Sequence, residues 1–217
     1  FANINTHPFP LLKDVVCLFI HIIQLTMSQF LKTITSRRTH YALQNTLPEG
    51  VTVDQVQSIV QQIVKHTPTS FNSQTVRAVI VTGELHKQIW GSVADAIENE
   101  SGKKRPISAK EEAYGSIIFF DEEETVKKFQ TDFAIYAPYF PIWATTANGA
   151  AQINTWAALQ EIGLGGHLQH YNGYVQAALG DRVPKSWSVQ AQIVFGTPVS
   201  GPYEKTFIDN EVKVLDK

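Results

Sequence analysis

The sequence predicts a single domain of the α+β class, in which helices pack on a small number of strands. Three short runs rich in β-branched and aromatic residues are typical of buried strands, and segments with helical spacing of apolar residues interleave with them. The alternation is too irregular for a doubly wound sheet. With 217 residues, of which 43% are hydrophobic, the chain is long enough to bury a sizeable core.

The first half is expected to contain helices over Met27–Arg37, Val53–His66 and Glu84–Glu100, and a strand over Val76–Thr82. The first helix has Phe30, Leu31 and Ile34 on one face. The second is introduced by Thr52 and Gln55, whose spacing is that of a capping box, and Pro68 ends it.

The second half is expected to contain strands over Ser116–Phe120 and Ser188–Phe195, a helix opening in the acidic run DEEETVKKF, a long helix over Pro141–Ile162, and a short one over Asn172–Leu179. Acidic residues favour a helix N-terminus because they complement the helix dipole. The long helix is rich in Ala and Gly, which let helices approach closely. It is therefore expected either at a subunit interface or buried within one subunit.

The composition excludes several function classes. The formal net charge is −2, and the basic run Lys103–Arg105 is short enough to be a solvated turn, so no nucleic-acid partner and no membrane-surface role are expected. Cys17 is the only cysteine, which excludes a disulfide framework and indicates a reducing compartment. We expect a cytoplasmic protein, with the nucleus as a further compartment.

Residues 1–26 are expected to be an extension upstream of a start at Met27, which leaves residues 27–217 as the domain. The segment lacks a basic leader, and its apolar stretch Val15–Leu25 is shorter than the roughly 20 residues that span a bilayer. A membrane-anchoring segment is the alternative interpretation.

Two adjacent arginines, Arg37 and Arg38, followed by Thr39 and Tyr41, form a candidate anion site. A guanidinium offers a planar set of donors that suits phosphate or carboxylate, and a threonine adds a hydroxyl. The alternative is that the arginines only complement the dipole at the end of the first helix.

Two further segments could contact a ligand. In TPTSFNSQ, the amides of Asn72 and Gln74 could read the edge of a flat heterocycle, although such residues are also common in turns. In GLGGHLQHYNG, the glycines permit close backbone approach, or they form a helix end and a tight turn. His167 and His170 have no nearby carboxylate or thiol, so no metal is expected.

Aromatic residues before the long helix could wall a pocket for flat molecules. Those singled out are Phe133, Tyr136 and Phe140. Their alternative role is core or interface packing. Since no nucleophile motif such as GxSxG is present, any chemistry is expected to be performed by a cofactor.

The order of four motifs is specific. SRRTHY, PTSFNSQ, GLGGHLQHYN and GTPVSGPYEKTF follow one another along the chain from Met27 to the C-terminus. In this order the chain resembles the FMN-dependent nitroreductase family, and most closely its fungal and bacterial branch linked to fatty-acid repression and nitro-compound resistance.

The resemblance implies roles for individual residues. Arg37, Arg38 and Thr39 would meet the FMN phosphate and the pyrimidine edge of the ring, and Lys205 would reach the phosphate from the end of the chain. Tyr41 stands where many relatives have a basic residue over the ring. The other residues implied in flavin binding are Asn72, Gln74, Leu164, Gly165 and Gly166.

The resemblance also implies the architecture and the activity. The fold would be a three-layer α/β/α sandwich that forms an intertwined homodimer with FMN at the interface. The activity would be NAD(P)H-dependent reduction of nitroaromatic or quinone-like acceptors by ping-pong hydride transfer through flavin N5, with NADH or NADPH as donor. The alternative is a flavin-binding regulatory protein in lipid signalling or oxidative-stress response, with incidental reductase activity.

Overall fold

The computed structural model describes residues 28–216, and the chain divides into two units, Phe1–Ser36 and Arg37–Lys217. The expectation for residues 1–26 lies outside the described residues. The described part of the first unit holds helix α2 (Gln29–Ser36), close to the helix expected there. No helix among residues 28–216 combines the length and the apolar character needed to cross a bilayer.

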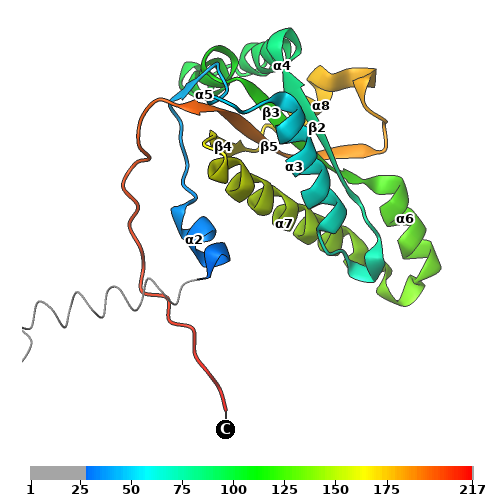
Figure 1. The fold of residues 1–217 in the computed structure, drawn as a ribbon. Coiled ribbons are helices and arrows are strands. Elements are labelled where there is room, and N and C mark those ends of the chain that lie inside the picture. The colour runs from blue at the N-terminus through cyan, green and yellow to red at the C-terminus, as the bar shows by residue number, and fades with distance from the viewer. Residues whose placement is uncertain (1–27, 217) are drawn as a thin grey trace, which may run out of the picture. The chain divides into compact units, whose positions relative to one another are not determined.

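The second unit is built on an antiparallel sheet (Figure 1). Its strands are β1 (Leu43–Gln44), β2 (Val76–Thr82), β3 (Gly115–Glu122), β4 (Gly165–Gln169) and β5 (Trp187–Pro198). Strand β5 pairs with β1, β3 and β4, and β3 pairs with β2. Strand β2 is therefore an edge strand in the described part of the chain.

Helices cover both faces of this sheet (Figure 1). They are α3 (Val53–His66), α4 (Gly83–Asp95), α5 (Glu100–Glu112), α6 (Glu123–Asp132), α7 (Phe140–Glu161) and α8 (Asn172–Leu179), with short 3-10 segments η1 (Ser70–Asn72), η2 (Ala134–Tyr139) and η3 (Gly180–Arg182). Helices α3 and α7 share one hydrophobic core with the sheet, and α4, α5 and α8 share the other.

Strand β3 shows why the sequence produces two cores. Its side chains alternate between the faces, so Ile117 and Phe119 pack with α3 and α7 while Ile118 and Phe120 pack with α4 and α8. All eight of its residues are buried. A continuous apolar run, rather than an alternating one, is what a strand covered on both faces requires. The expected three-layer α+β architecture is confirmed.

Several boundaries follow local rules. Helix α3 begins after Thr52, whose side chain accepts a hydrogen bond from the Gln55 amide at 3.2 Å, as its capping pattern predicts. Strand β2 and helix α8 have the predicted bounds, and Gly83 follows β2 with a φ of 57°. Helix α7 starts and ends within one residue of the prediction.

Two predictions about residues 84–112 are wrong. The expected helix over Glu84–Glu100 ends at Asp95, and a new helix begins at Glu100, where the Asn99 side chain accepts from the Ser101 amide at 2.9 Å. The Asn99 cap starts a second helix, which the spacing of apolar residues alone does not reveal. Lys103–Arg105 consequently lies in helix α5 and is not a solvated turn.

The glycine-rich segment after α7 also differs from expectation. Gly163, with a φ of 85°, ends the helix, but Gly165 and Gly166 already belong to strand β4. A Cβ on Gly166 would lie 2.8 Å from the Val194 carbonyl oxygen, and one on Gly165 would lie 2.9 Å from the Pro198 Cβ. These glycines allow β4 to approach β5, which is a packing requirement of the sheet.

Candidate functional site

The segment Arg37–Tyr41 crosses the domain beside the end of α7. The Arg38 amide donates to the Gln160 side chain at 2.7 Å, and the His40 amide donates to the Gly166 carbonyl at 2.9 Å. The His40 ring bonds to the Ser200 carbonyl at 3.2 Å. The segment is thus fixed to α7, to β4 and to the chain that follows β5, and Thr39 lies half-buried within it.

Within residues 28–216, no carboxylate lies within ion-pair distance of either arginine. The Arg37 guanidinium stacks on the Trp156 ring, 4.2 Å from its centroid, and its Nη1 is buried without a hydrogen-bond partner. Arg38 donates to the Tyr203 carbonyl. Burial lowers the pKa of Arg37, and the neighbouring Arg38 charge lowers it further. A buried guanidinium nitrogen without a partner is costly, so the site is shaped for an anion.

The alternative interpretation, that these arginines only complement the dipole of the preceding helix, is weakened by the structure. Helix α2 ends at Ser36, and its last turn contains no basic residue. Arg37 and Arg38 make their contacts with Trp156 and Tyr203 in the second unit instead. Their positions therefore fit an anion site better than a helix-dipole role.

Tyr41 stands in a cluster that the sequence did not reveal. Its ring lies 5.3 Å from the His167 ring and 6.1 Å from the Tyr203 ring, and the Arg105 guanidinium of α5 sits 4.1 Å from its centroid. Burial, followed by the charge of Arg105, lowers the pKa of His167 to about 3. Arg105 was missed because a polar helix with Pro106 inside it carries little helical signal.

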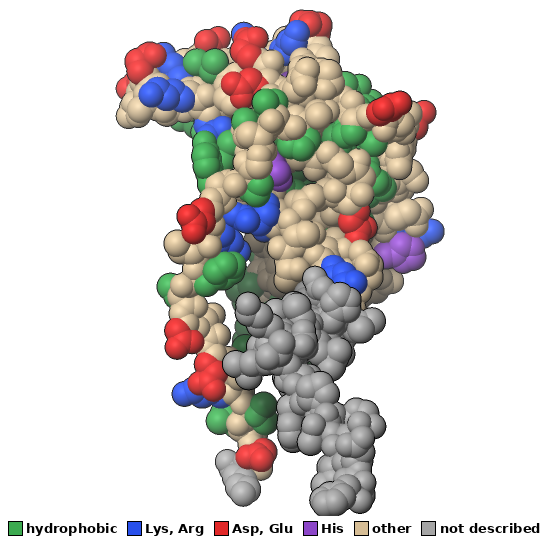
Figure 2. Space-filling view, turned by 60° about the vertical axis from the view of Figure 1, so that its left-hand side comes forward, with side chains coloured by type: hydrophobic (Ala, Val, Ile, Leu, Met, Phe, Trp, Pro, Cys, Tyr) green, Lys and Arg blue, Asp and Glu red, His purple; other side chains and the backbone are tan. Residues whose placement is uncertain are grey.

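Figure 2 shows Lys and Arg side chains in a recess between the extended C-terminal segment and the body of the domain. The contacts of Arg38 and Tyr41 with Tyr203 lie along this segment. Lys205 is exposed two residues further on, with its ammonium 5.1 Å from the Phe207 ring centroid. Within residues 28–216 it is Tyr203, and not Lys205, that contacts the arginine segment.

The predicted amide loop has an unusual backbone. Phe71, Asn72 and Gln74 all have positive φ values, of 56°, 52° and 50°. Such conformations are disfavoured for residues other than glycine and are typical of functional loops. The Thr69 hydroxyl accepts from the Gln74 amide at 2.9 Å and holds the turn. The Asn72 and Gln74 side chains remain exposed.

The same loop meets the predicted aromatic wall. The Phe71 ring lies 4.7 Å from Phe133, 5.5 Å from both Tyr136 and Phe140, and 6.0 Å from Trp143. Phe71, Phe133 and Tyr136 are partly exposed, whereas Phe140 is buried with α6 and α7. The structure therefore brings the amide loop and the aromatic wall together, with Phe140 as a supporting core residue.

The two halves of the predicted site lie far apart in one chain. The arginine segment contacts Trp156, and the amide loop contacts Trp143, near opposite ends of α7. These tryptophans are thirteen positions apart in α7, which is about 20 Å at a rise of roughly 1.5 Å per residue. One chain does not bring the two halves together. Leu164, Gly165 and Gly166 lie at the arginine end.

Comparison with known proteins identifies relatives over most of the chain. The model of the Nitroreductase family matches residues 34–199. The HBN1 protein of Saccharomyces cerevisiae is 55% identical over 190 residues, covering 88% of this chain and 98% of that protein. A crystal structure of a nitroreductase from the same yeast has a TM-score of 0.76 and 50% identity, over 80% of this chain and 98% of that one.

Two bacterial structures extend the comparison. The nitroreductase CinD of Lactococcus lactis, solved with 4-nitrophenol, is 37% identical with a TM-score of 0.75, over 83% of this chain and 95% of that one. A nitroreductase with bound FMN from Desulfitobacterium hafniense has a TM-score of 0.61, over 85% of this chain and 100% of that one. At 15% identity, the second likeness concerns the fold alone.

Proposed function

The chain belongs to the nitroreductase family, and we propose that it is an FMN-dependent NAD(P)H oxidoreductase that reduces nitroaromatic or quinone-like acceptors. When bound, FMN would supply the chemistry, accepting a hydride from NADH or NADPH at N5 and passing electrons to the acceptor. The protein's own residues would bind and orient the cofactor, stabilise its charge and shield the reacting groups from water.

The observation that carries this proposal is the buried, unpartnered Nη1 of Arg37 beside Arg38. A phosphate carries a charge of about −1.5 to −2 and three acceptor oxygens, which suits two guanidiniums that have no carboxylate partner in the described part of the chain. Each charge-assisted hydrogen bond would contribute about 1.5–3 kcal/mol. Thr39 would add a hydroxyl, and Lys205 is proposed to add a third cation from the C-terminal segment.

The remaining cofactor contacts are proposed from position and chemistry. Tyr41, Leu164, Gly165 and Gly166 lie at the arginine end of α7, where the backbone of β4 could face the flavin ring. At the other end, the exposed amides of Asn72 and Gln74 offer donors and an acceptor for the ring edge.

The partly exposed rings around Phe71 are proposed to form the acceptor wall. Phe133 and Tyr136 offer flat apolar faces on which an aromatic acceptor could stack. CinD was solved with 4-nitrophenol and with chloramphenicol, both nitroaromatic compounds, which supports this class of acceptor.

The test of this function is an absorbance spectrum of the purified protein. We expect a yellow protein, or a colourless one that turns yellow with FMN, and loss of the flavin band on anaerobic addition of NADH or NADPH. Addition of 4-nitrophenol should then restore the band. A protein that remains colourless once excess FMN has been removed by gel filtration would refute the proposal, and the comparison of the two nicotinamides would assign the donor.

We further propose a homodimer, because one chain does not bring together the two halves of the proposed site. The arginine segment of one copy would meet the amide loop of the other across α7. The outward face of α7 supports this arrangement, since it carries Ile142, Gly149 and Ile153 at helical spacing, all exposed in the single chain. A second copy would cover these residues.

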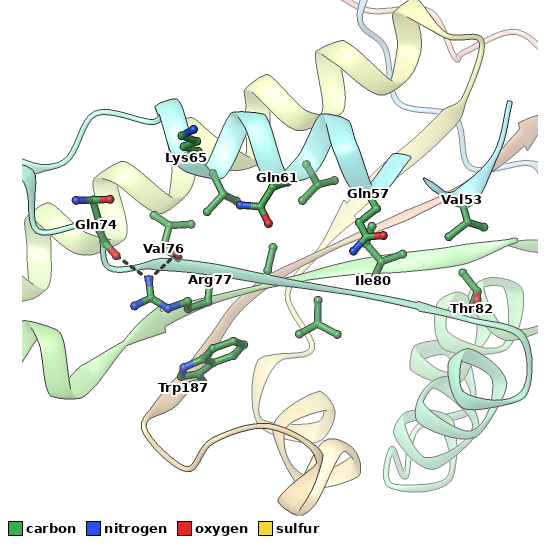
Figure 3. A pocket seen from close by; sticks show the side chains of 14 residues that line it. Val53, Gln57, Gln61, Lys65, Gln74, Val76, Arg77, Ile80, Thr82 and Trp187 are labelled. Carbon is green, nitrogen blue, oxygen red and sulfur yellow. Dashed lines mark hydrogen bonds between the residues drawn. The ribbon is translucent and has the colours of Figure 1, made fainter. Parts of the chain in front are cut away.

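A groove along the edge strand offers a second contact between copies. It lies between α3 and β2 and encloses about 700 Å³ (Figure 3). Its polar lining residues are Gln57, Gln61, Lys65, Gln74, Arg77 and Thr82, and the others are apolar or aromatic. The C-terminal segment has exposed Val212 and Val214 at strand spacing, next to acidic side chains. We propose that this segment of one copy adds to the β2 edge of the other.

Light scattering after size exclusion tests the dimer. We expect twice the mass of one chain for the full-length protein and a larger monomer fraction after removal of residues 207–217. A monomeric full-length protein that still binds FMN would contradict the dimer while leaving the oxidoreductase proposal in place.

A further inference from the structure

Arg105 differs from the other basic residues of helix α5. Lys103 pairs with Glu100 at 2.7 Å, Lys110 pairs with Glu111 at 3.1 Å, and Lys104 is exposed. Arg105 is half-buried, and among the described residues no carboxylate lies within ion-pair distance of it. Its guanidinium is instead directed onto Tyr41, 4.1 Å from the ring centroid.

This placement adds a third guanidinium to the arginine segment. Arg38 contacts the Tyr203 carbonyl, the Tyr203 ring lies 6.1 Å from the Tyr41 ring, and Arg105 covers Tyr41. Arg38 and Arg105 thus lie at the two ends of this series of contacts, and two half-buried positive charges without carboxylate partners among the described residues favour an anion nearby. A cation–π contact with Tyr41 offsets only about 0.5–2 kcal/mol of the cost of burying the charge.

The positive charge of Arg105 acts on β4, the strand proposed to face the flavin. Tyr41 contacts both Arg105 and His167, and His167 directly follows Gly166 in β4. The charge of Arg105 also contributes to the lowered pKa of His167. Position 41 itself carries a neutral phenol, so the positive charge next to the proposed ring site comes from α5.

We propose that Arg105 is a positioning residue for the flavin, which by stacking on Tyr41 holds a positive charge beside the ring and favours the reduced cofactor. The inference rests on the proposed function. Two-electron reduction of FMN at neutral pH takes up two electrons and one proton, which leaves a net negative charge on the ring. A nearby fixed cation therefore binds the reduced form more tightly than the oxidised form.

The experiment compares Arg105→Gln with Lys104→Gln, which removes one positive charge from the adjacent, exposed position. Each FMN complex is titrated with dithionite against a reference dye to obtain its midpoint potential, and FMN affinity is measured separately by fluorescence. We expect Arg105→Gln to weaken binding of reduced FMN about tenfold more than binding of oxidised FMN, which lowers the potential by about 30 mV. Lys104→Gln should keep the wild-type potential.

A second pair of variants makes the test independent of how well Arg105→Gln folds. Tyr41→Phe keeps the ring under the guanidinium and should keep the potential, whereas Tyr41→Leu removes the stacking surface and should lower it. Equal potentials in wild type, Arg105→Gln and Tyr41→Leu would overturn the inference, even if melting temperatures fall. Wild-type protein that binds no FMN would overturn the proposed function and this role together.

Discussion

Replacing Arg37 by Met tests whether this arginine binds the FMN phosphate or stabilises the fold. Methionine retains contact with the Trp156 ring, since a thioether packs favourably against an aromatic surface, but it removes the charge and the buried, unpartnered Nη1. If Arg37 holds the FMN phosphate, the variant loses one or more charge-assisted hydrogen bonds of about 1.5–3 kcal/mol each. The dissociation constant for FMN should therefore rise about 10- to 150-fold.

Although Arg37→Met should weaken FMN binding, it should not destabilise the ligand-free protein. An unsatisfied buried donor costs about 1–3 kcal/mol, so its removal should leave the melting temperature of the apoprotein unchanged or raise it. The assay is quenching of FMN fluorescence on titration with apoprotein, combined with thermal unfolding in the absence and presence of FMN. Arg182→Met is the matched control, because Arg182 is exposed and donates only to the Leu179 carbonyl at 3.4 Å.

Two results would refute this reasoning. FMN affinity of Arg37→Met within twofold of wild type would show that the unpartnered guanidinium does not hold the phosphate. A lower melting temperature of the apoprotein, by several degrees, would show instead that Arg37 serves to stabilise the fold.

Three further predictions concern stability. The pKa of His167 is about 3 in the folded state, whereas the unfolded chain takes up this proton near pH 6.5. The free energy of unfolding should therefore fall by about 1.4 kcal/mol per pH unit as the pH drops from about 6.5 towards 3. His167→Gln should remove this part of the slope in denaturant titrations. Burial raises the pKa of Asp121, which accepts a hydrogen bond from Asn148 at 2.7 Å. The folded state therefore binds this proton more tightly than the unfolded chain, and the free energy of unfolding should decline as the pH rises above the ordinary pKa of 3.8. Asp121→Asn should raise the unfolding midpoint more at pH 7 than at pH 3, and an equal rise at both would contradict this. Gly166→Ala should destabilise by about 1–3 kcal/mol in thermal unfolding, because its Cβ would meet the Val194 carbonyl oxygen at 2.8 Å, while Gly173→Ala in the open helix α8 should be neutral or stabilising.

Elements with strong local signals were predictable from the sequence. The apolar stripe and Thr52 cap of α3, the β-branched run of β2 and the small-residue run of α7 each fix their element without help from tertiary structure. The three-layer architecture was implied only by the family resemblance, and the buried run of β3 agrees with it.

Elements that depend on tertiary contacts were not predictable. Gly165 and Gly166 of β4 carry no strand propensity, but at these two positions an added Cβ would lie within 3 Å of β5, so glycine fits there. Helix α5 is polar and contains Pro106, so it lacks the pattern of an amphipathic helix and is defined by the Asn99 cap and its packing on α4.

For the candidate site, the sequence motifs single out several residues but neither their geometry nor the participation of Arg105. The motifs single out Arg37, Arg38, Asn72 and Gln74. The buried Arg37 nitrogen without a hydrogen-bond partner and the stacking of Arg105 on Tyr41 depend on tertiary contacts, which the sequence alone does not show. The same holds for the separation of the two halves by about 20 Å along α7, which no motif order reveals.

The most direct test of the account is complementation between two defective copies. Arg37→Met and Asn72→Ala chains carrying different tags are produced together, and the mixed dimer is isolated and loaded with FMN. If each flavin is held by the arginine segment of one copy and the amide loop of the other, the mixed dimer contains one intact site. It should then bind about half the FMN of wild type and reduce 4-nitrophenol with NADH or NADPH at about half the rate, while both parent proteins remain defective. A mixed dimer as defective as its parents would contradict a site shared between copies.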